Sequence, residues 1–279
     1  MASGVLRSFG VGASVARAAL AWIRRDPNAS ALERTNFHGR TVTLAGGPAL
    51  ALGATTAAAL GARDGRTAAA VVAAGAVSGA VGLYDDVVGN RPEQKVFKGF
   101  AGHLGALREG QVTSGLVKIA GVGAGAFVAS ALIGSNRRTR MGRATDVLLG
   151  AGVIAGTANL INLLDLRPGR AIKASAVIGA PLALGRGGGV AAGTLGAASG
   201  LVADDLAEEI MLGDSGANAL GALLGVALIA RTGPAGRTAA LAALASLTAA
   251  SEKVSFTQVI QDTPWLRYLD ELGRRPPSA

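Results

Sequence analysis

Long apolar stretches, separated by short polar breaks, recur along nearly the whole chain. They cover residues 4–23, 42–62, 67–84, 115–134, 146–164, 171–185, 189–203, 216–230 and 238–251. Many of them approach the roughly 20 residues that an α-helix needs to cross a bilayer. The pattern therefore predicts an all-α polytopic membrane protein with about nine transmembrane helices. The first stretch is interrupted by Arg17, so a position in the membrane interface is an alternative for it.

The chain becomes amphipathic after its last apolar stretch. Apolar and polar residues alternate there, and the Asp-Thr-Pro sequence at 262–264 is typical of a helix start. Trp265 and Tyr268 follow, and such residues favour the membrane surface. We therefore expect a membrane domain at residues 1–251 and an amphipathic cytoplasmic tail at residues 252–279.

Composition supports a membrane protein and narrows its partners. Half of the residues are hydrophobic, only 16% are charged, and glycines four residues apart, such as Gly221 and Gly225, predict close helix packing. The net charge of +9 would suggest nucleic acid in a soluble chain, but loops beside lipid headgroups can hold this charge. We expect membrane lipids and no nucleic acid as partners. The lack of cysteine excludes disulfides and thiolate metal sites.

Two adjacent carboxylates, Asp85 and Asp86, directly follow the third apolar stretch. Like charges side by side repel unless a positive group lies between them, and an aspartate at the membrane boundary needs water, a cation or a partner. A divalent metal ion that carries phosphates meets these requirements. An ordinary helix C-terminus followed by acidic loop residues is the alternative, and this pair alone favours neither.

Two further polar motifs lie at ends of apolar stretches. Asn159, Asn162 and Asp165 recur every three residues, which places them on one side of a helix where they suit a polar ligand. Asp214 belongs to a Gly-Asp-x-Gly motif at the start of a later stretch, where free N–H groups favour phosphate oxygens. Capping of that helix by Asp214 or Ser215 is the alternative.

Alternation across the predicted spans places all of these aspartates on one side of the membrane. Every acidic residue except Asp64 and Asp146 falls on that side. Lysine and arginine are slightly more numerous there too, which favours a cytoplasmic location. The arginine-rich segment at 137–143 lies on the opposite side and counts against it.

Cationic side chains on the same side are candidates for phosphate binding. The longest internal polar segment, residues 90–114, contains Lys95 and Lys98, and Arg40 lies in the first loop. These cations can share the neutralisation of a phosphorylated substrate. A solvated or headgroup-facing loop is the commoner explanation of a charged run.

The ordered set of motifs resembles a known membrane family. Asp-Asp-x-x-Gly from Asp85, Asn-x-x-Asn-x-x-Asp ending at Asp165 and Gly-Asp-x-Gly around Asp214 resemble the polyprenyl-phosphate N-acetylhexosamine-1-phosphate transferases. This is the superfamily of phospho-MurNAc-pentapeptide translocase and the GlcNAc-1-phosphate transferases. The loop at 34–47 is similar to the family's Thr-Pro-Thr-x-Gly-Gly segment, so the resemblance covers most of the chain. No single motif is specific, but the ordered set is.

The resemblance implies transfer of a sugar-1-phosphate from a UDP-sugar to polyprenyl phosphate in cell-envelope glycan synthesis, such as that of peptidoglycan. It implies Mg²⁺ as cofactor and an active site on the cytoplasmic face of the plasma membrane. Besides these substrates, a homodimer partner stays open. The expected catalytic residues are Asp85, Asp86 and Asp165, the expected Mg²⁺ ligands are Asp86 and Asp214, and the expected substrate-binding residues are Asn159, Asn162, Arg40, Lys95 and Lys98.

Several positions depart from the family pattern. Leu166 and Pro168 replace a glycine and a second acidic residue, Met211 stands where an aromatic ring often stacks on uracil, and Val42 replaces a proline. These departures concern the nucleotide and the sugar more than the metal centre. They keep open a catalytically inactive relative that binds polyprenyl phosphate or scaffolds envelope enzymes. A transporter would favour acidic residues deep within spans and repeated halves, and the sequence has neither.

Overall fold

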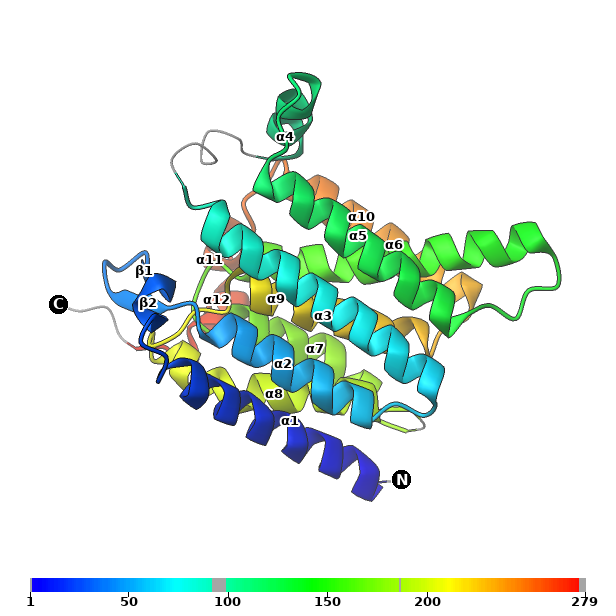
Figure 1. Ribbon diagram of the computed structural model, residues 1–279, viewed down its shortest axis with the longest axis horizontal. Coiled ribbons are helices and arrows are strands. Elements are labelled where there is room, and N and C mark those ends of the chain that lie inside the picture. The colour runs from blue at the N-terminus through cyan, green and yellow to red at the C-terminus, as the bar shows by residue number, and fades with distance from the viewer. Residues whose placement is uncertain (1, 92–98, 186, 276–279) are drawn as a thin grey trace.

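The computed structural model describes residues 2–91, 99–185 and 187–275, and in these residues the chain is almost entirely helical (Figure 1). Each apolar stretch of the sequence overlaps with one helix, and the stretch at 42–62 begins with a short strand before its helix. The elements in chain order are α1 (Ala2–Ile23), η1 (Ala29–Leu32), β1 (Glu33–Thr35), β2 (Thr41–Thr43), α2 (Gly46–Leu60), α3 (Gly65–Val88), α4 (Gly99–Arg108), α5 (Ser114–Ile133), α6 (Arg140–Leu164), α7 (Arg170–Ala183), α8 (Gly189–Leu206), α9 (Gly213–Ile229), α10 (Pro234–Ser251), α11 (Phe256–Asp262) and α12 (Pro264–Glu271).

Three helices of the described chain, α3, α5 and α6, are long and apolar enough to cross a membrane. The helices α2 and α9 are also apolar but have only 15 and 17 residues. An all-helical protein with three candidate membrane-spanning helices is therefore what length and composition establish. The nine crossings predicted from the sequence go beyond this finding.

A short hairpin interrupts the all-α architecture within the segment that the sequence presents as a basic loop. Strand β1 pairs antiparallel with β2, and Thr35 lies opposite Thr41. The turn forms because the Asn36 side-chain oxygen accepts the N–H groups of His38 and Arg40, both at 2.9 Å, and because Gly39 has a φ of +77°. The β-branched residues of β2, Thr-Val-Thr, are typical of a strand, but each strand has only three residues.

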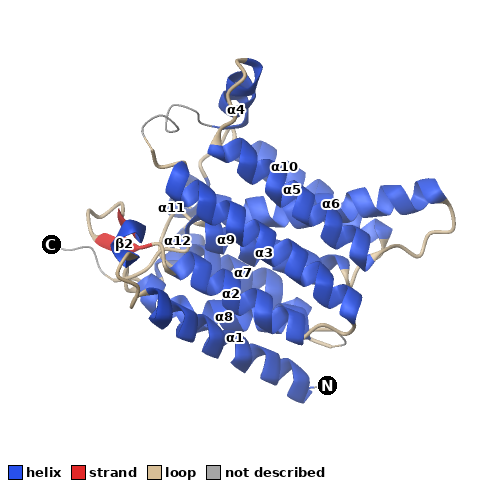
Figure 2. Cartoon of the chain, in the orientation of Figure 1, coloured by secondary structure: helices blue, strands red, loops and turns tan. Residues whose placement is uncertain are grey.

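Helix α9 lies at the centre of the bundle and packs against α2, α3 and α6 (Figure 2). It is apolar around its circumference, as expected of a helix covered on all sides, and Leu220 and Leu223 are fully buried. Gly221 and Gly225 lie against α6: a Cβ at Gly221 would lie 2.4 Å from the Thr157 carbonyl oxygen. Small residues are therefore what allow these backbones to approach.

The helices end at two opposite ends of the bundle (Figure 1). We call the end where α3 and α6 terminate and α5 and α9 begin the motif end. The hairpin and the C-terminal helices α11 and α12 also lie there. A backbone pairing of Thr43 with Ile210 fastens the hairpin to the segment just before α9. The motif end is therefore where the polar segments gather.

We predict that Gly82→Ala destabilises the fold. A Cβ at Gly82 would lie 2.4 Å from the Asp214 carbonyl oxygen, so α3 and α9 would have to separate. Overpacking of this kind lowers the free energy of unfolding by roughly 1–3 kcal/mol. Thermal unfolding in detergent measures the change. The matched control is Gly123→Ala in α5, where a Cβ meets no atom within 4 Å; equal unfolding temperatures of both variants would contradict the prediction.

Candidate functional site

Polar side chains from four helices meet at the motif end. Asp85 and Asp86 come from the last turns of α3, and Lys118 lies near the start of α5. Asn162 lies in the last turn of α6, and Asp214 is in the first turn of α9. These segments are far apart in the sequence, so only the packing of the helices brings them together.

One lysine bridges two of the carboxylates. The Lys118 Nζ lies 2.6 Å from Oδ2 of Asp85 and 2.5 Å from Oδ2 of Asp214. The other oxygen of Asp214 accepts a hydrogen bond from the Asn162 amide at 2.5 Å. An opposite charge between two carboxylates removes the repulsion that would otherwise keep them apart. Two carboxylates therefore contact one cationic nitrogen, that of Lys118.

Asp86 has a different role from its neighbour, because it caps the start of α9. Its Oδ1 accepts the N–H of Asp214 at 2.9 Å and its Oδ2 accepts the N–H of Ser215 at 3.0 Å. The first N–H groups of a helix have no partner within the helix, and its positive end favours a carboxylate. The cap therefore comes from α3. The sequence suggested that these N–H groups are free to bind phosphate oxygens. In the structure they donate to Asp86 instead.

Glycine at 213 makes this contact sterically feasible. Its φ is +56°, in the left-handed region that L side chains rarely adopt. A Cβ there would lie 2.8 and 2.9 Å from the two carboxylate oxygens of Asp86. Ser215 adds a bond between the same helices, because its hydroxyl donates to the Gly79 carbonyl at 2.9 Å. The Gly-Asp-x-Gly motif thus has a packing role in joining α3 to α9.

A cavity of about 210 Å³ contains Asp165 and lies between the hairpin, the α6–α7 loop and the segment before α9. Removal from water raises the pKa of Asp165 well above its usual range, and the carboxylates of Asp205, Asp214 and Asp86 raise it further. Leu212, which directly precedes Gly213 and Asp214, also lines the cavity, so the cavity adjoins the carboxylate cluster. Its walls include Phe37, Arg167, Pro168, Asp205 and Met211.

Glu208 connects the hairpin to the segment before α9. Its carboxylate accepts a hydrogen bond from the Asn36 amide at 2.5 Å, lies 2.9 Å from Nδ1 of His38 and pairs with Arg40 at 3.4 Å. Burial raises the pKa of Glu208, but the bonds to His38 and Asn36 outweigh it, so its pKa lies below the ordinary value. Glu208 also has a φ of +56°, which is uncommon for a residue with a side chain.

Across the cavity opening, the Arg167 guanidinium lies 3.9 Å from the centre of the Phe37 ring. This cation–π contact joins the hairpin to the α6–α7 loop. Side-chain contacts thus connect the hairpin and the α6–α7 loop, which form two walls of the cavity.

The structure separates the residues expected at the site into groups. Asp85, Asp86, Asn162 and Asp214 form the cluster, and Asp165 lies in the adjoining cavity. Two expected residues bind other partners: Asn159 donates to the Thr248 hydroxyl of α10 at 3.1 Å, and Arg40 pairs with Glu208. Lys95 and Lys98 lie outside the described residues.

Sequence reasoning missed Lys118 and Glu208. Lys118 had a usable signal, because a lysine within an apolar span must find an acidic partner or the interface. Its distance from the motifs along the chain hid which partner it meets. Glu208 had no such signal, because it is one of several acidic residues in a polar segment.

Asp85 and Asp214 are the carboxylates of the cluster that face one cationic position, which the Lys118 ammonium occupies. Among the described residues, no group of three or more histidine, cysteine, aspartate or glutamate side chains is arranged to hold a metal. Mg²⁺, however, is commonly held by one or two carboxylates together with phosphate oxygens and water. Asp85 and Asp214 suit this mode because both face one cationic position. Asp86, expected as a ligand, already uses both oxygens on the backbone of α9.

Comparisons with other proteins assign no family. No protein-family model matches the sequence, and no curated protein matches it either. The functional conclusion therefore depends on the residues, their geometry and the ordered motifs.

We predict that Asp86→Asn weakens the join between α3 and α9. Asp86 uses both carboxylate oxygens, whereas an asparagine offers one acceptor oxygen for the two N–H groups and no charge for the helix start. Loss of one hydrogen bond should lower the free energy of unfolding by about 1 kcal/mol. Thermal unfolding measures this. Asp85→Asn serves as the control, because Asp85 pairs with Lys118 and Asp214 keeps that lysine paired. An equal loss of stability in both variants would show that capping of α9 by Asp86 adds no more to the free energy of unfolding than the contacts of Asp85 do.

Proposed function

We propose that this protein is a Mg²⁺-dependent membrane transferase that moves a sugar-1-phosphate from a UDP-sugar to polyprenyl phosphate, on the cytoplasmic face of the plasma membrane. The observation that most supports this proposal is the cluster of Asp85, Lys118 and Asp214 at the motif end. Bringing two anionic phosphates together needs a cation between them, and two carboxylates that face one position could hold a divalent cation for this purpose. The ordered motifs of the sequence support the same activity.

Each residue of the cluster has a role in this proposal. Asp85 and Asp214 would hold Mg²⁺, which when bound neutralises phosphate oxygens and orients them. Lys118 would turn toward a phosphate while remaining next to both carboxylates. Asn162 holds Asp214 by its side chain, and Asp86 holds it by its backbone N–H. Asp214 is thus oriented from two sides, as a metal ligand should be.

The cavity around Asp165 would receive the nucleotide. It adjoins the cluster, so a nucleotide there would direct its diphosphate toward Asp214. Phe37 and Met211 supply apolar surface for a base, and Arg167 supplies positive charge at the opening.

The topology proposed from the sequence is that α1–α3 and α5–α10 each cross the membrane. The two sets of helix ends lie at opposite ends of the bundle, which supports one orientation for all motif loops (Figure 1). Helix α2, with 15 residues, spans only about 22 Å at 1.5 Å per residue. Such short helices suit crossings that are flanked by other helices, as α2 is by α1, α3, α8 and α9.

We predict that Asp85→Asn and Asp214→Asn each lower transferase activity by at least about a hundredfold, because each removes a charge that holds the metal beside the phosphates. The assay measures UMP release by purified protein from a panel of UDP-sugars with polyprenyl phosphate, with and without Mg²⁺. Asp64→Asn is the matched control. Asp64 caps the opposite end of α3 by accepting the Thr67 N–H at 2.8 Å, and asparagine caps equally well.

Undiminished product from both cluster variants would refute the catalytic assignment. The pairing of Lys118 with Asp85 and Asp214 also favours a second candidate, a non-catalytic protein that binds polyprenyl phosphate, because the lysine already holds the two carboxylates together without a metal. That candidate expects lipid-phosphate binding by the wild type without UMP release from any UDP-sugar.

A further inference from the structure

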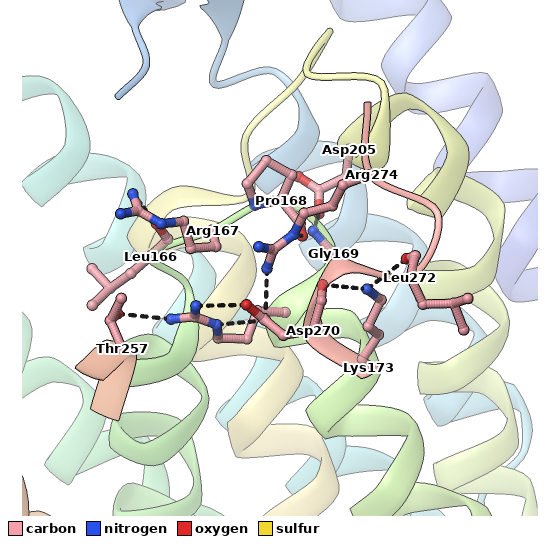
Figure 3. Close-up of polar contacts among 11 residues, drawn as sticks. Leu166, Arg167, Pro168, Gly169, Lys173, Asp205, Thr257, Asp270, Leu272 and Arg274 are labelled. Atoms are coloured by element: carbon pink, nitrogen blue, oxygen red, sulfur yellow. Dashed lines mark hydrogen bonds and ion pairs between the residues drawn. The ribbon is translucent and has the colours of Figure 1, made fainter. Parts of the chain in front are cut away.

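The C-terminal segment, which we define as residues 256–275, is joined to the start of α7 by a buried ion pair between Asp270 and Arg170 (Figure 3). Asp270 of α12 accepts two hydrogen bonds from Arg170, one from Nε at 2.8 Å and one from Nη2 at 2.9 Å. Both residues are about 95% buried. Paired bonds between a guanidinium and a carboxylate fix their relative orientation as well as their distance.

More bonds connect the same segment to the loop (Figure 3). Arg274 bonds Asp270 at 2.6 Å through Nη2, and its Nε donates to the Pro168 carbonyl at 2.8 Å. Lys173 donates to the carbonyls of Asp270 and Leu272, both at 2.7 Å. The α6–α7 loop is therefore held from the C-terminal side at Pro168 and, through Arg170, at the start of α7.

Helix α8 holds the same loop from another side. The Gly169 N–H donates to the Asp205 carboxylate at 2.7 Å. Gly169 has a φ of +73°, and a Cβ there would lie 2.4 Å from Cδ2 of Leu206. The loop thus runs between two anchors, and the residues just before them, Leu166 and Arg167, line the cavity together with Asp165.

Packing does not explain why α12 lies here. Asp270 is the one buried residue of α12, while Trp265 and Tyr268 on its outer side are 64% and 67% exposed. An amphipathic helix normally buries its apolar side chains, and this one buries a carboxylate. Ionic bonds to the start of α7 and to the preceding loop are thus the buried contacts that hold α12, which points to a role for the loop's conformation.

We propose that Asp270 and Arg274 are positioning residues: they hold the α6–α7 loop, with Asp165 and Arg167, in the conformation that receives the nucleotide part of the donor substrate. The inference rests on the function proposed for the cavity. We call the bonds of Asp270 and Arg274 to Arg170 and Pro168 the clamp. These bonds reach the α6–α7 loop and the start of α7, so loss of the clamp should affect the nucleotide-sugar and leave the polyprenyl phosphate site intact.

The kinetic test compares Asp270→Asn and Arg274→Ala with the wild type. Both variants should raise the KM for the UDP-sugar about tenfold, because a small displacement of the loop misplaces the nucleotide. The KM for polyprenyl phosphate should stay within about twofold, a split that general destabilisation does not produce. Arg274→Ala keeps the Arg170–Asp270 pair, so it serves if Asp270→Asn folds poorly. The matched control is Asp262→Asn, since Asp262 bonds Gln258 of its own helix.

A second measurement needs no activity. The chain has no cysteine, so Leu166→Cys gives a single labelling site on the loop, at a side chain that is 59% exposed. A nitroxide there should become more mobile in the Asp270→Asn and Arg274→Ala backgrounds and stay unchanged with Asp262→Asn. Unchanged mobility and an unchanged KM ratio would overturn the clamp while leaving the transferase proposal standing. Mobile labels in a wild-type-folded protein without any transfer would show that the two residues hold the loop, but would overturn their role in nucleotide binding together with the transferase.

Discussion

Negative charge at the motif end of an apolar bundle has to be neutralised, and the way this happens determines the arrangement of the central helices. Asp85 and Asp214 share the Lys118 ammonium, and Asp86 is bound by the free N–H groups that begin α9. These bonds join α3, α5 and α9 at one point. Gly82 and Gly213 make the approach feasible, because a side chain at either would meet the partner helix. The candidate chemistry and the helix packing thus depend on the same contacts.

A second set of acidic residues surrounds this cluster and holds loops. Glu208 fastens the hairpin, Asp205 binds the N–H of Gly169, and Asp270 binds Arg170 and Arg274. The accumulation of acidic residues on one side of the protein therefore has two origins. One set faces the site where a cation and phosphates would lie, and the other shapes the cavity beside it. Both sets are needed if the loops are to keep a binding site in one conformation.

The sequence predicted correctly that three of the aspartates lie at the same end of the bundle. Asp85, Asp165 and Asp214 stand at ends of apolar stretches, and the alternation of such stretches places those ends together. The sequence did not predict which partner a polar side chain contacts. Asn159 lies on the same side of the helix as Asn162 but donates a hydrogen bond to Thr248. Arg40 forms an ion pair with Glu208 and not with the cluster. The hairpin was missed because its strands have only three residues each.

The pattern of apolar stretches by itself determined the helices, because an apolar run of this length has few other stable forms, and it determined which helix ends carry the carboxylates. Tertiary structure alone decided that Asp86 caps a helix more than a hundred residues away along the chain, that Lys118 lies between Asp85 and Asp214, and that Asp270 reaches the α6–α7 loop. The physical reason is that hydropathy is local, whereas the partner of a buried charge is chosen by the packing of distant segments.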